Sequence, residues 1–305
     1  INGTYDSVTT GFFHPVNKRD VMANFFYFKL LPPLSSQQTF YFRIQSDEQI
    51  ILPAFIGSSS VMANHRYIKG IISGLIWGIL LATAFYNLFI FIATKDQTYL
   101  YHVAHTACML VILDMNTSGI IFVISGQPYL NYYKFTLTGL GFITAVAFCT
   151  SFLKTRQTMP KLHSGLLLFY IAAVLIIALS LFRQNLVSNV LIQIVAIILS
   201  VYLIIVGIVA NYKRLPGAMY YLTGWSFLLG SVIIVILLLN DLVPASLLII
   251  PPSFLINYIV EAGTVMEIIV ISIALSHRLT ILRLEKESAQ SEKIAMIEYL
   301  NETLH

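Results

Sequence analysis

Charged side chains are scarce in this sequence. Asp, Glu, Lys and Arg make up 10% of its 305 residues, whereas hydrophobic residues make up 57% and the mean hydropathy is +0.80. Soluble domains carry roughly 25% charged residues, so this composition excludes an ordinary water-soluble protein. Residues 70–277 hold 8 basic and 5 acidic side chains, and residues 278–305 alone hold 4 basic and 5 acidic ones. This shift marks a boundary between a membrane-embedded body and a solvated tail.

Cysteine and catalytic motifs are also lacking. The two cysteines, Cys108 and Cys149, lie in apolar stretches, and none occurs in residues 1–69, so no disulfide framework or Cys-based metal site is indicated. We find no Ser/His/Asp arrangement, Gly-rich phosphate loop or HExxH motif, and therefore expect no catalytic residue and no cofactor. The net charge of +4 comes from basic residues in short loops, where membrane topology accounts for them without a nucleic-acid partner.

Proline is absent from seven long apolar runs. A helix needs about 20 mostly apolar residues to cross the hydrocarbon core, and proline removes a backbone donor that lipid cannot replace. All ten prolines fall outside these runs. The sequence therefore predicts an α-helical integral membrane protein, a seven-transmembrane helix bundle with spans at 70–93, 98–116, 135–153, 165–182, 186–210, 218–239 and 254–276.

Loop charges set the expected orientation. With the N-terminus outside, the three inner loops hold six basic residues and the outer loops only two. This asymmetry favours an N-terminus outside and a C-terminus in the cytoplasm under the positive-inside rule. The inner set is Lys95, Lys154, Arg156, Lys161, Lys213 and Arg214, and the outer set is Lys134 and Arg183. We therefore expect a multi-pass membrane protein surrounded by lipid.

Residues 1–69 are typical of β-strands. The segments "ANFFYFKLLPP" and "QTFYFRIQSD" are rich in aromatics with partial alternation, and the turn-type cluster "LPPLSSQQ" separates them. A third candidate strand is "QIILPAFIGSSS". So few strands are marginal alone; we therefore expect part of an extracellular all-β domain, whose ligand-binding residues are unknown.

Residues 278–305 are predicted to continue the last span as a cytoplasmic helix, because their helix propensity is good throughout. Heptad positions counted from Leu275 are mostly apolar or small, but two are lysines. This imperfect seam favours a two-stranded coiled coil, and hence a homodimer, over a solvated amphipathic helix. The seam comprises Leu275, Leu279, Leu282, Lys286, Ala289, Lys293, Met296, Leu300 and Thr303.

Several polar side chains fall at membrane depth, where they are costly and call for explanation. We hypothesise that Glu261 or Glu267 joins a polar network linking the last helix to the second; local hydrogen bonding near the interface is an equal alternative. His102 and His105 share a helix face, but two ligands without a third do not predict a metal site. The network candidates are Asn87, His102, His105, Asp114, Glu261 and Glu267.

Two motifs carry a family resemblance. "YNLFIFIATKDQTYLYH" contains Tyr86-Asn87-Leu88-Phe89, Asp96, Tyr99, Leu100 and Tyr101, and "VMEIIVISIALSHRL" contains Glu267, Ser272, Ala274, Leu275 and Arg278. They resemble the first-to-second helix junction and the last helix of the bacterial seven-transmembrane receptors with diverse intracellular signalling modules. Residues 26–57 resemble the C-terminal half of that family's extracellular jelly-roll domain.

The resemblance implies a receptor of the bacterial inner membrane with three parts: the jelly-roll segment 1–69, the helical domain 70–277 and the cytoplasmic signalling helix 278–305. In that family the jelly roll is proposed to bind carbohydrate-like or other small molecules. The output module that follows is a diguanylate cyclase, histidine kinase, nucleotide cyclase or phosphatase. We expect that module beyond His305, and no catalytic activity in this chain.

Two rival functions were weighed. A retinal photoreceptor needs a lysine in its last span, and residues 254–276 contain none. A membrane transporter or channel-like protein is the more serious alternative, but transporters favour internal repeats and broken helices, neither of which is visible. If the protein is a receptor that passes a signal through its helices, the spacing of Gly74 and Gly78 would allow close helix contact. An incidental spacing is an equal alternative.

Overall fold

The computed structural model describes residues 7–11, 14, 16–21, 26–30, 39–45, 54–116, 119, 121, 133–239, 243–244 and 252–304. Most of these residues are helical. The elements are η1 (Val16–Lys18), a 3-10 helix, and the α-helices α1 (Ser59–Thr94), α2 (Gln97–Asn116), α4 (Lys134–Phe152), α5 (Thr155–Thr158), α6 (Pro160–Leu181), α7 (Asn185–Tyr212), α8 (Ala218–Leu239) and α9 (Pro252–Leu304).

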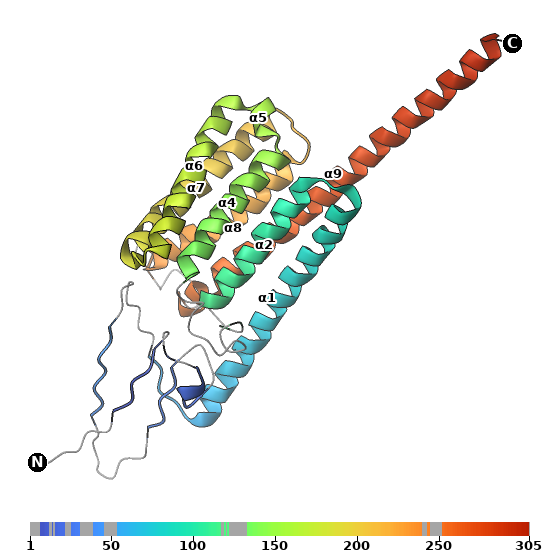
Figure 1. Ribbon diagram of the computed structural model, residues 1–305. Coiled ribbons are helices and arrows are strands. Elements are labelled where there is room, and N and C mark those ends of the chain that lie inside the picture. The colour runs from blue at the N-terminus through green and yellow to red at the C-terminus, as the bar shows by residue number, and fades with distance from the viewer. Residues whose placement is uncertain are drawn as a thin grey trace, which may run out of the picture.

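The long helices pack as a closed ring in chain order, as Figure 1 shows. α1 packs against α2, α2 against α4, and the order continues through α6, α7 and α8 to α9, which returns to α1. Where a short loop joins successive helices, as between α1 and α2 or α6 and α7, it makes them antiparallel neighbours. As a result α9, the helix farthest along the chain, lies beside α1 and α2.

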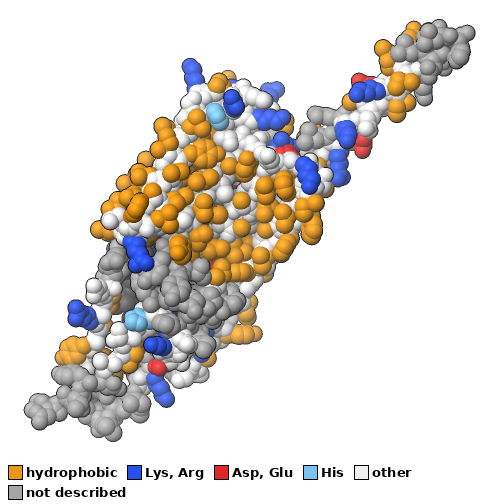
Figure 2. All heavy atoms as spheres, in the orientation of Figure 1, with side chains coloured by type: hydrophobic (Ala, Val, Ile, Leu, Met, Phe, Trp, Pro, Cys, Tyr) orange, Lys and Arg blue, Asp and Glu red, His pale blue; other side chains and the backbone are white. Residues whose placement is uncertain are grey.

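Six of these helices, α1, α4, α6, α7, α8 and α9, are long and apolar enough to cross a membrane. Large aliphatic side chains cover the outside of the bundle (Figure 2). α2 has 20 residues, long enough for a seventh crossing, but polar residues dilute its hydropathy. Those residues are buried inside the protein, as a lipid environment requires. They are Thr98, His102, His105, Thr106 and Asp114. The predicted seven-transmembrane bundle is thus confirmed.

Helix α1 starts earlier than predicted, at Ser59 rather than at residue 70. The Ser58 hydroxyl accepts a hydrogen bond from the Val61 backbone N at 3.4 Å and caps the helix. A search for apolar runs misses the turns before residue 70, because they are polar. The helix includes them nevertheless, because helix propagation costs little once a helix is nucleated. The expected boundary between residues 69 and 70 therefore lies inside a continuous helix.

The segment before α1 is only partly described. In its described residues η1 is the only regular element, so the strands predicted at 23–33, 38–47 and 49–60 are not seen where they are described, and the rest of each lies outside the described residues. Two aromatics from the first two predicted strands do meet: the rings of Phe28 and Phe42 lie 6.1 Å apart in a T-shaped arrangement. The β domain stays a prediction.

Helix α9 is 53 residues long. It runs through the bundle and continues well beyond it, whereas the described residues before α1 lie near the opposite end (Figure 1). The prediction that the tail continues the last span as a single helix is confirmed. A rotation or shift of α9 in the bundle would therefore be carried directly into the tail.

Candidate functional site

The turn between α1 and α2 is held by its own polar side chains. The Thr94 hydroxyl accepts a hydrogen bond from the Asp96 backbone N at 3.3 Å. Lys95 adopts a left-handed backbone with φ 58°, and its N–H bonds back to the last turn of α1. Asp96 then caps α2, its Oδ1 accepting from the Thr98 backbone N at 2.9 Å. The turn thus ends one helix and starts the next within three residues.

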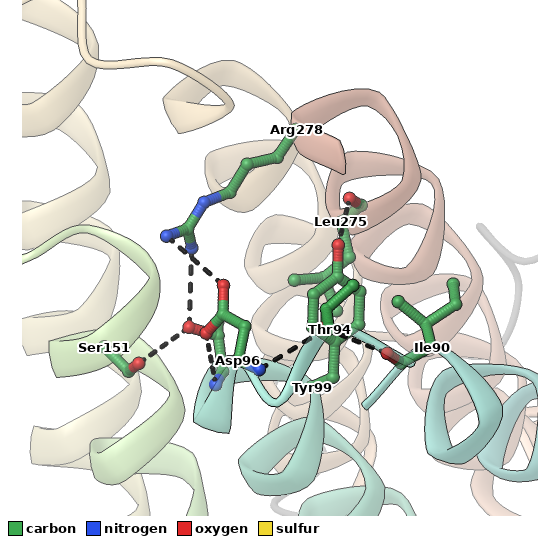
Figure 3. Close-up of polar contacts among 8 residues, drawn as sticks. Ile90, Thr94, Asp96, Tyr99, Ser151, Leu275 and Arg278 are labelled. Atoms are coloured by element: carbon green, nitrogen blue, oxygen red, sulfur yellow. Dashed lines mark hydrogen bonds and ion pairs between the residues drawn. The ribbon is translucent and has the colours of Figure 1, made fainter. Parts of the chain in front are cut away.

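The same turn binds α9 where that helix leaves the bundle (Figure 3). Arg278 Nη2 lies 3.6 Å from Asp96 Oδ2, and Arg278 Nη1 donates to Thr98 Oγ1 at 3.4 Å. Thr98 Oγ1 also shares a hydrogen bond of 2.7 Å with the Ser151 hydroxyl of α4. A single threonine hydroxyl therefore connects α2, α4 and α9.

Three further hydrogen bonds fix α9 just inside this turn. The Tyr99 hydroxyl, on α2, donates to the Leu275 carbonyl oxygen at 2.9 Å (Figure 3). Asn87 on α1 is buried and donates through Nδ2 to the Ser272 hydroxyl at 2.9 Å. The hydroxyls of Tyr86 and Ser276 lie 3.1 Å apart. We call this set the α9 junction, comprising Tyr86, Asn87, Asp96, Thr98, Tyr99, Ser151, Ser272, Leu275, Ser276 and Arg278.

A second polar site lies deeper in the bundle. His105 Nε2 of α2 approaches Glu267 Oε2 of α9 to 3.8 Å, and each residue is 1% exposed. His102 is equally buried, and its ring lies 5.4 Å from that of Phe148. Trp225 of α8 places its ring 6.0 Å from the ring of His105. This buried pair therefore joins α2 to α9 at a position enclosed by α4 and α8.

A third site lies toward the other end of α2. Asp114 Oδ1 accepts a hydrogen bond from Trp77 Nε1 of α1 at 3.2 Å, and its Oδ2 accepts from the Ile121 backbone N at 2.9 Å. Asp114 and Glu261 both line a cavity of about 10 Å³ between α1, α2 and α9, together with Ser73. That volume holds about one water molecule, and its walls offer several polar partners for it.

The six network candidates therefore form three sites rather than one. Asn87 belongs to the α9 junction, and Asp114 and Glu261 share the cavity. The remaining three, His102, His105 and Glu267, lie around the buried pair. Of the two glutamates, Glu267 is the one near a histidine of α2. In the described part of the chain, no three His, Cys, Asp or Glu side chains are grouped so as to hold a metal ion.

The predicted seam of the tail is mostly solvent-exposed. Leu279 is half-buried near the bundle, whereas Ala289 and Met296 are exposed, and the side chains of Leu282 and Leu300 lie outside the described residues. Five large apolar residues of the tail, Met296 among them, are exposed by 58–63%. These residues are Leu284, Ile294, Met296, Ile297 and Tyr299. An isolated tail therefore leaves apolar side chains in water along much of its length.

Sequence analysis missed several residues of these sites. Thr98 and Ser151 look like ordinary hydroxyl residues, although an Asp two positions before Thr98 is a helix-start signal. Trp77 had a usable signal, since a tryptophan N–H at membrane depth normally finds a partner. Which residue Trp225 would meet had no such signal, because only the rotation of α8 brings its ring beside that of His105.

Comparison with known families bears on this arrangement. A family model described as 7TM diverse intracellular signalling matches residues 69–278, and a model described as 7TMR-DISM extracellular 2 matches residues 1–58. The chain belongs to the 7TMR-DISM family. Comparisons with curated proteins and with solved structures gave no match. The 7TMR-DISM helical match ends at Arg278 and includes the whole α9 junction.

Membership of the 7TMR-DISM family gives the chain its general role. It is a multi-pass membrane protein, and its helical domain is a sensory rather than a catalytic unit. It acts as a transmembrane sensory receptor of the class that couples to diverse intracellular signalling. The α9 junction lies at the carboxyl-terminal end of the matched helical domain, where α9 leaves the bundle (Figure 1).

Proposed function

We propose that this receptor senses a small molecule, such as a carbohydrate, outside the cell and controls a C-terminal signalling enzyme by shifting α9. The output enzyme would be of the diguanylate cyclase or histidine kinase type and would follow the tail. Residues 1–58 would carry the sensing role, supported by their match to an extracellular family model. The signal would pass through the helix packing to the α9 junction.

One observation carries this proposal: the α1–α2 turn and the start of α2 bind α9 at the point where that unbroken helix leaves the bundle. The Asp96–Arg278 pair and the Tyr99–Leu275 hydrogen bond both act on the last turn before the tail. α1 is also linked to the amino-terminal segment, since the Arg66 guanidinium lies 5.4 Å over the ring of Tyr27. Displacement of α1 would therefore act on α9 through the turn.

The energies suit a switch rather than a permanent lock. Partly exposed ion pairs stabilise by about 0–1 kcal/mol, and a typical net hydrogen bond by about 0.5–1.5 kcal/mol. Arg278 is 15% and Asp96 29% exposed, so this pair belongs with the partly exposed ion pairs, the weaker of these two kinds of contact. Moving a population from 1:99 to 99:1 takes about 5.5 kcal/mol. A few contacts of this size are comparable to what one ligand can supply, so the junction can be made or released by binding.

The tail would act as a dimer. Its exposed apolar side chains would be covered by a second copy in a coiled coil, and two lysines at seam positions would keep that coil weak. Weak pairing suits a signalling helix, because a small rotation of α9 then changes which residues meet. The transporter alternative finds no comparable support, since the described spans run without internal breaks.

Disulfide cross-linking in membranes tests the proposal. Met296→Cys, Lys293→Cys and Ala289→Cys would be introduced singly into the 305-residue chain, with and without Asp96→Asn. We expect cross-linked dimers that favour some positions, and a changed preference when Asp96→Asn weakens the junction. Lys95→Asn is the matched control, because it alters the same turn without touching α9. No cross-link at any position, or the same pattern in all backgrounds, would refute the mechanism.

A further inference from the structure

Five cations lie at the end of the bundle where α9 leaves it. They belong to two neighbouring connections: the one from α4 through α5 to the first turn of α6, and the one from α7 to α8. The sequence contains no Asp or Glu between residues 115 and 240, so no acidic side chain on these loops balances them. All five are exposed, and Figure 2 shows Lys and Arg side chains at this end, next to the apolar surface of the bundle. We call this set the basic corner: Lys154, Arg156, Lys161, Lys213 and Arg214.

The basic corner is held in place by the loop structure. Lys154 and Arg214 both adopt left-handed backbone conformations, with φ 49° and 55°. The Thr158 hydroxyl donates to the Leu153 and Lys154 carbonyl oxygens at 3.0 and 3.1 Å. The Lys213 ammonium donates to the Thr158 carbonyl oxygen at 2.5 Å, which ties the loop after α7 to the loop before α6. The two loops therefore present their charges together.

The surface beside the basic corner is apolar and faces outward. On α6, Leu168 is 66% exposed, and on α7, Ile208 is 52% exposed. Tyr212, next to Lys213, is 89% exposed at the end of α7. Tyrosine is enriched at the membrane–water interface, where its ring and hydroxyl reach different layers. In a membrane these features would place the cations at headgroup height, directly above a surface that meets acyl chains.

We propose that the basic corner binds the headgroup of an anionic phospholipid, whose acyl chains lie along α6 and α7. The phosphate would be held by Arg156 and Lys161 on one loop and by Lys213 and Arg214 on the other. Anionic lipid fits better than a soluble polyanion, because the cations adjoin lipid-facing side chains. This inference goes beyond the sensory role and needs only that this end of the bundle lies in a headgroup layer.

Native mass spectrometry of the purified 305-residue chain tests the site. Phosphatidylglycerol and phosphatidylcholine of the same acyl chains are added separately, and the affinity of the first bound lipid is compared. Wild type should prefer phosphatidylglycerol. A cation near an anionic surface is worth about fivefold in binding, so Arg156→Gln with Lys161→Gln should reduce the preference by about 25-fold, and Arg214→Asn alone by about fivefold.

The control variant removes two cations from the other end of the bundle, Lys134→Gln with Arg183→Asn, and should leave the preference unchanged. Arg156→Lys with Lys161→Arg keeps the charge and should retain binding. Helical content and elution volume check that each variant is folded. Equal binding of the two lipids by wild type would overturn the proposal, as would an equal loss in the control. Displacement of the lipid by equimolar glycerol phosphate would instead indicate a site for free phosphate esters and also overturn it.

Discussion

At the scale of single residues, Arg278 joins α9 to two neighbouring helices and the turn between α1 and α2. It meets Asp96 in that turn and Thr98 of α2, and its guanidinium carbon lies 5.8 Å from the ring centre of Phe152 on α4. An arginine can serve all three because its planar fork binds carboxylates and also stacks on aromatic rings. A lysine would keep the charge but lose the second donor and the stacking.

The Asp96–Arg278 pair should show measurable coupling. We predict that Asp96→Asn and Arg278→Gln each lower the free energy of unfolding by about 1 kcal/mol or less. The double variant should lose less than the sum, because the two residues act on each other. Unfolding of the four proteins in mixed micelles, followed by helical content, checks this cycle. Strict additivity would mean that the 3.6 Å approach stabilises nothing.

The two buried glutamates should differ in their coupling to His105. Glu267→Gln removes one partner of a buried pair, and breaking such a pair is destabilising by about 3–5 kcal/mol when the other group stays charged. We therefore predict that Glu267→Gln and His105→Gln destabilise non-additively. Glu261→Gln, which alters the neighbouring cavity, should be additive with His105→Gln. Thermal unfolding of the single and double variants measures both couplings, and equal coupling for the two glutamates would contradict the geometry.

The identity of these polar residues could be predicted from sequence, but their grouping could not. Asn87, His105 and Glu267 stand out because polar groups are costly in lipid. Which of them meet depends on how each helix is rotated about its axis, and a sequence that is apolar on every face does not encode that rotation visibly. The six residues could therefore be named as candidates for a polar network, but their distribution over three sites is visible only in the structure.

At the scale of helices, the apolar runs located the spans well. α8 has the predicted bounds, and α2, α4 and α7 differ by at most two residues at either end. α1 differed most, because its first turns are polar and a Ser58 cap rather than hydrophobicity sets its start. Hydropathy predicts where a helix can cross lipid, whereas capping sets where it begins.

Helix packing gives different roles to glycines that look alike in sequence. Gly74 and Gly78 have the spacing of a close-contact motif, yet a Cβ at either would meet nothing within 4 Å. Gly263 of α9 is the reverse case: a Cβ there would overlap the Ser231 side chain and lie 2.9 Å from the Phe227 carbonyl oxygen. Gly263 thus marks a close approach between α8 and α9, which no sequence motif indicated.

We predict that Gly263→Ala destabilises the bundle by about 1–3 kcal/mol, since α8 and α9 must move apart to admit the methyl group. Gly78→Ala is the matched control on α1 and should be neutral or stabilising by up to about 1 kcal/mol, because alanine favours helix. Unfolding in mixed micelles measures both. Equal effects of the two substitutions would show that α8 and α9 leave more space at Gly263 than the structure has.

The disulfide cross-linking of the tail provides a second measurement on the same variants. Loss of cross-linking in Gly78→Ala alone would indicate that a second copy of the chain covers α1.

At the scale of the whole molecule, a bundle of seven crossings predicts that the two ends of the chain lie on opposite sides of the membrane. The described residues before α1 and the free part of α9 lie at opposite ends of the bundle (Figure 1). This separation is what a receptor requires, because sensing and output must lie in different compartments. Loop charge, with six basic residues against two, supports sensing outside and output inside.

Labelling of single cysteines in intact cells tests that orientation. Val8 is 68% exposed in the amino-terminal segment, and Ile294 is 58% exposed on the tail. A membrane-impermeant maleimide should modify Val8→Cys in intact cells but Ile294→Cys only after lysis. The parent chain is the control for background, because Cys149 is buried and Cys108 only half-exposed. Modification of both positions from one side would require an even number of crossings, and α2, whose hydropathy is diluted by buried polar residues, would be the first helix to reassign.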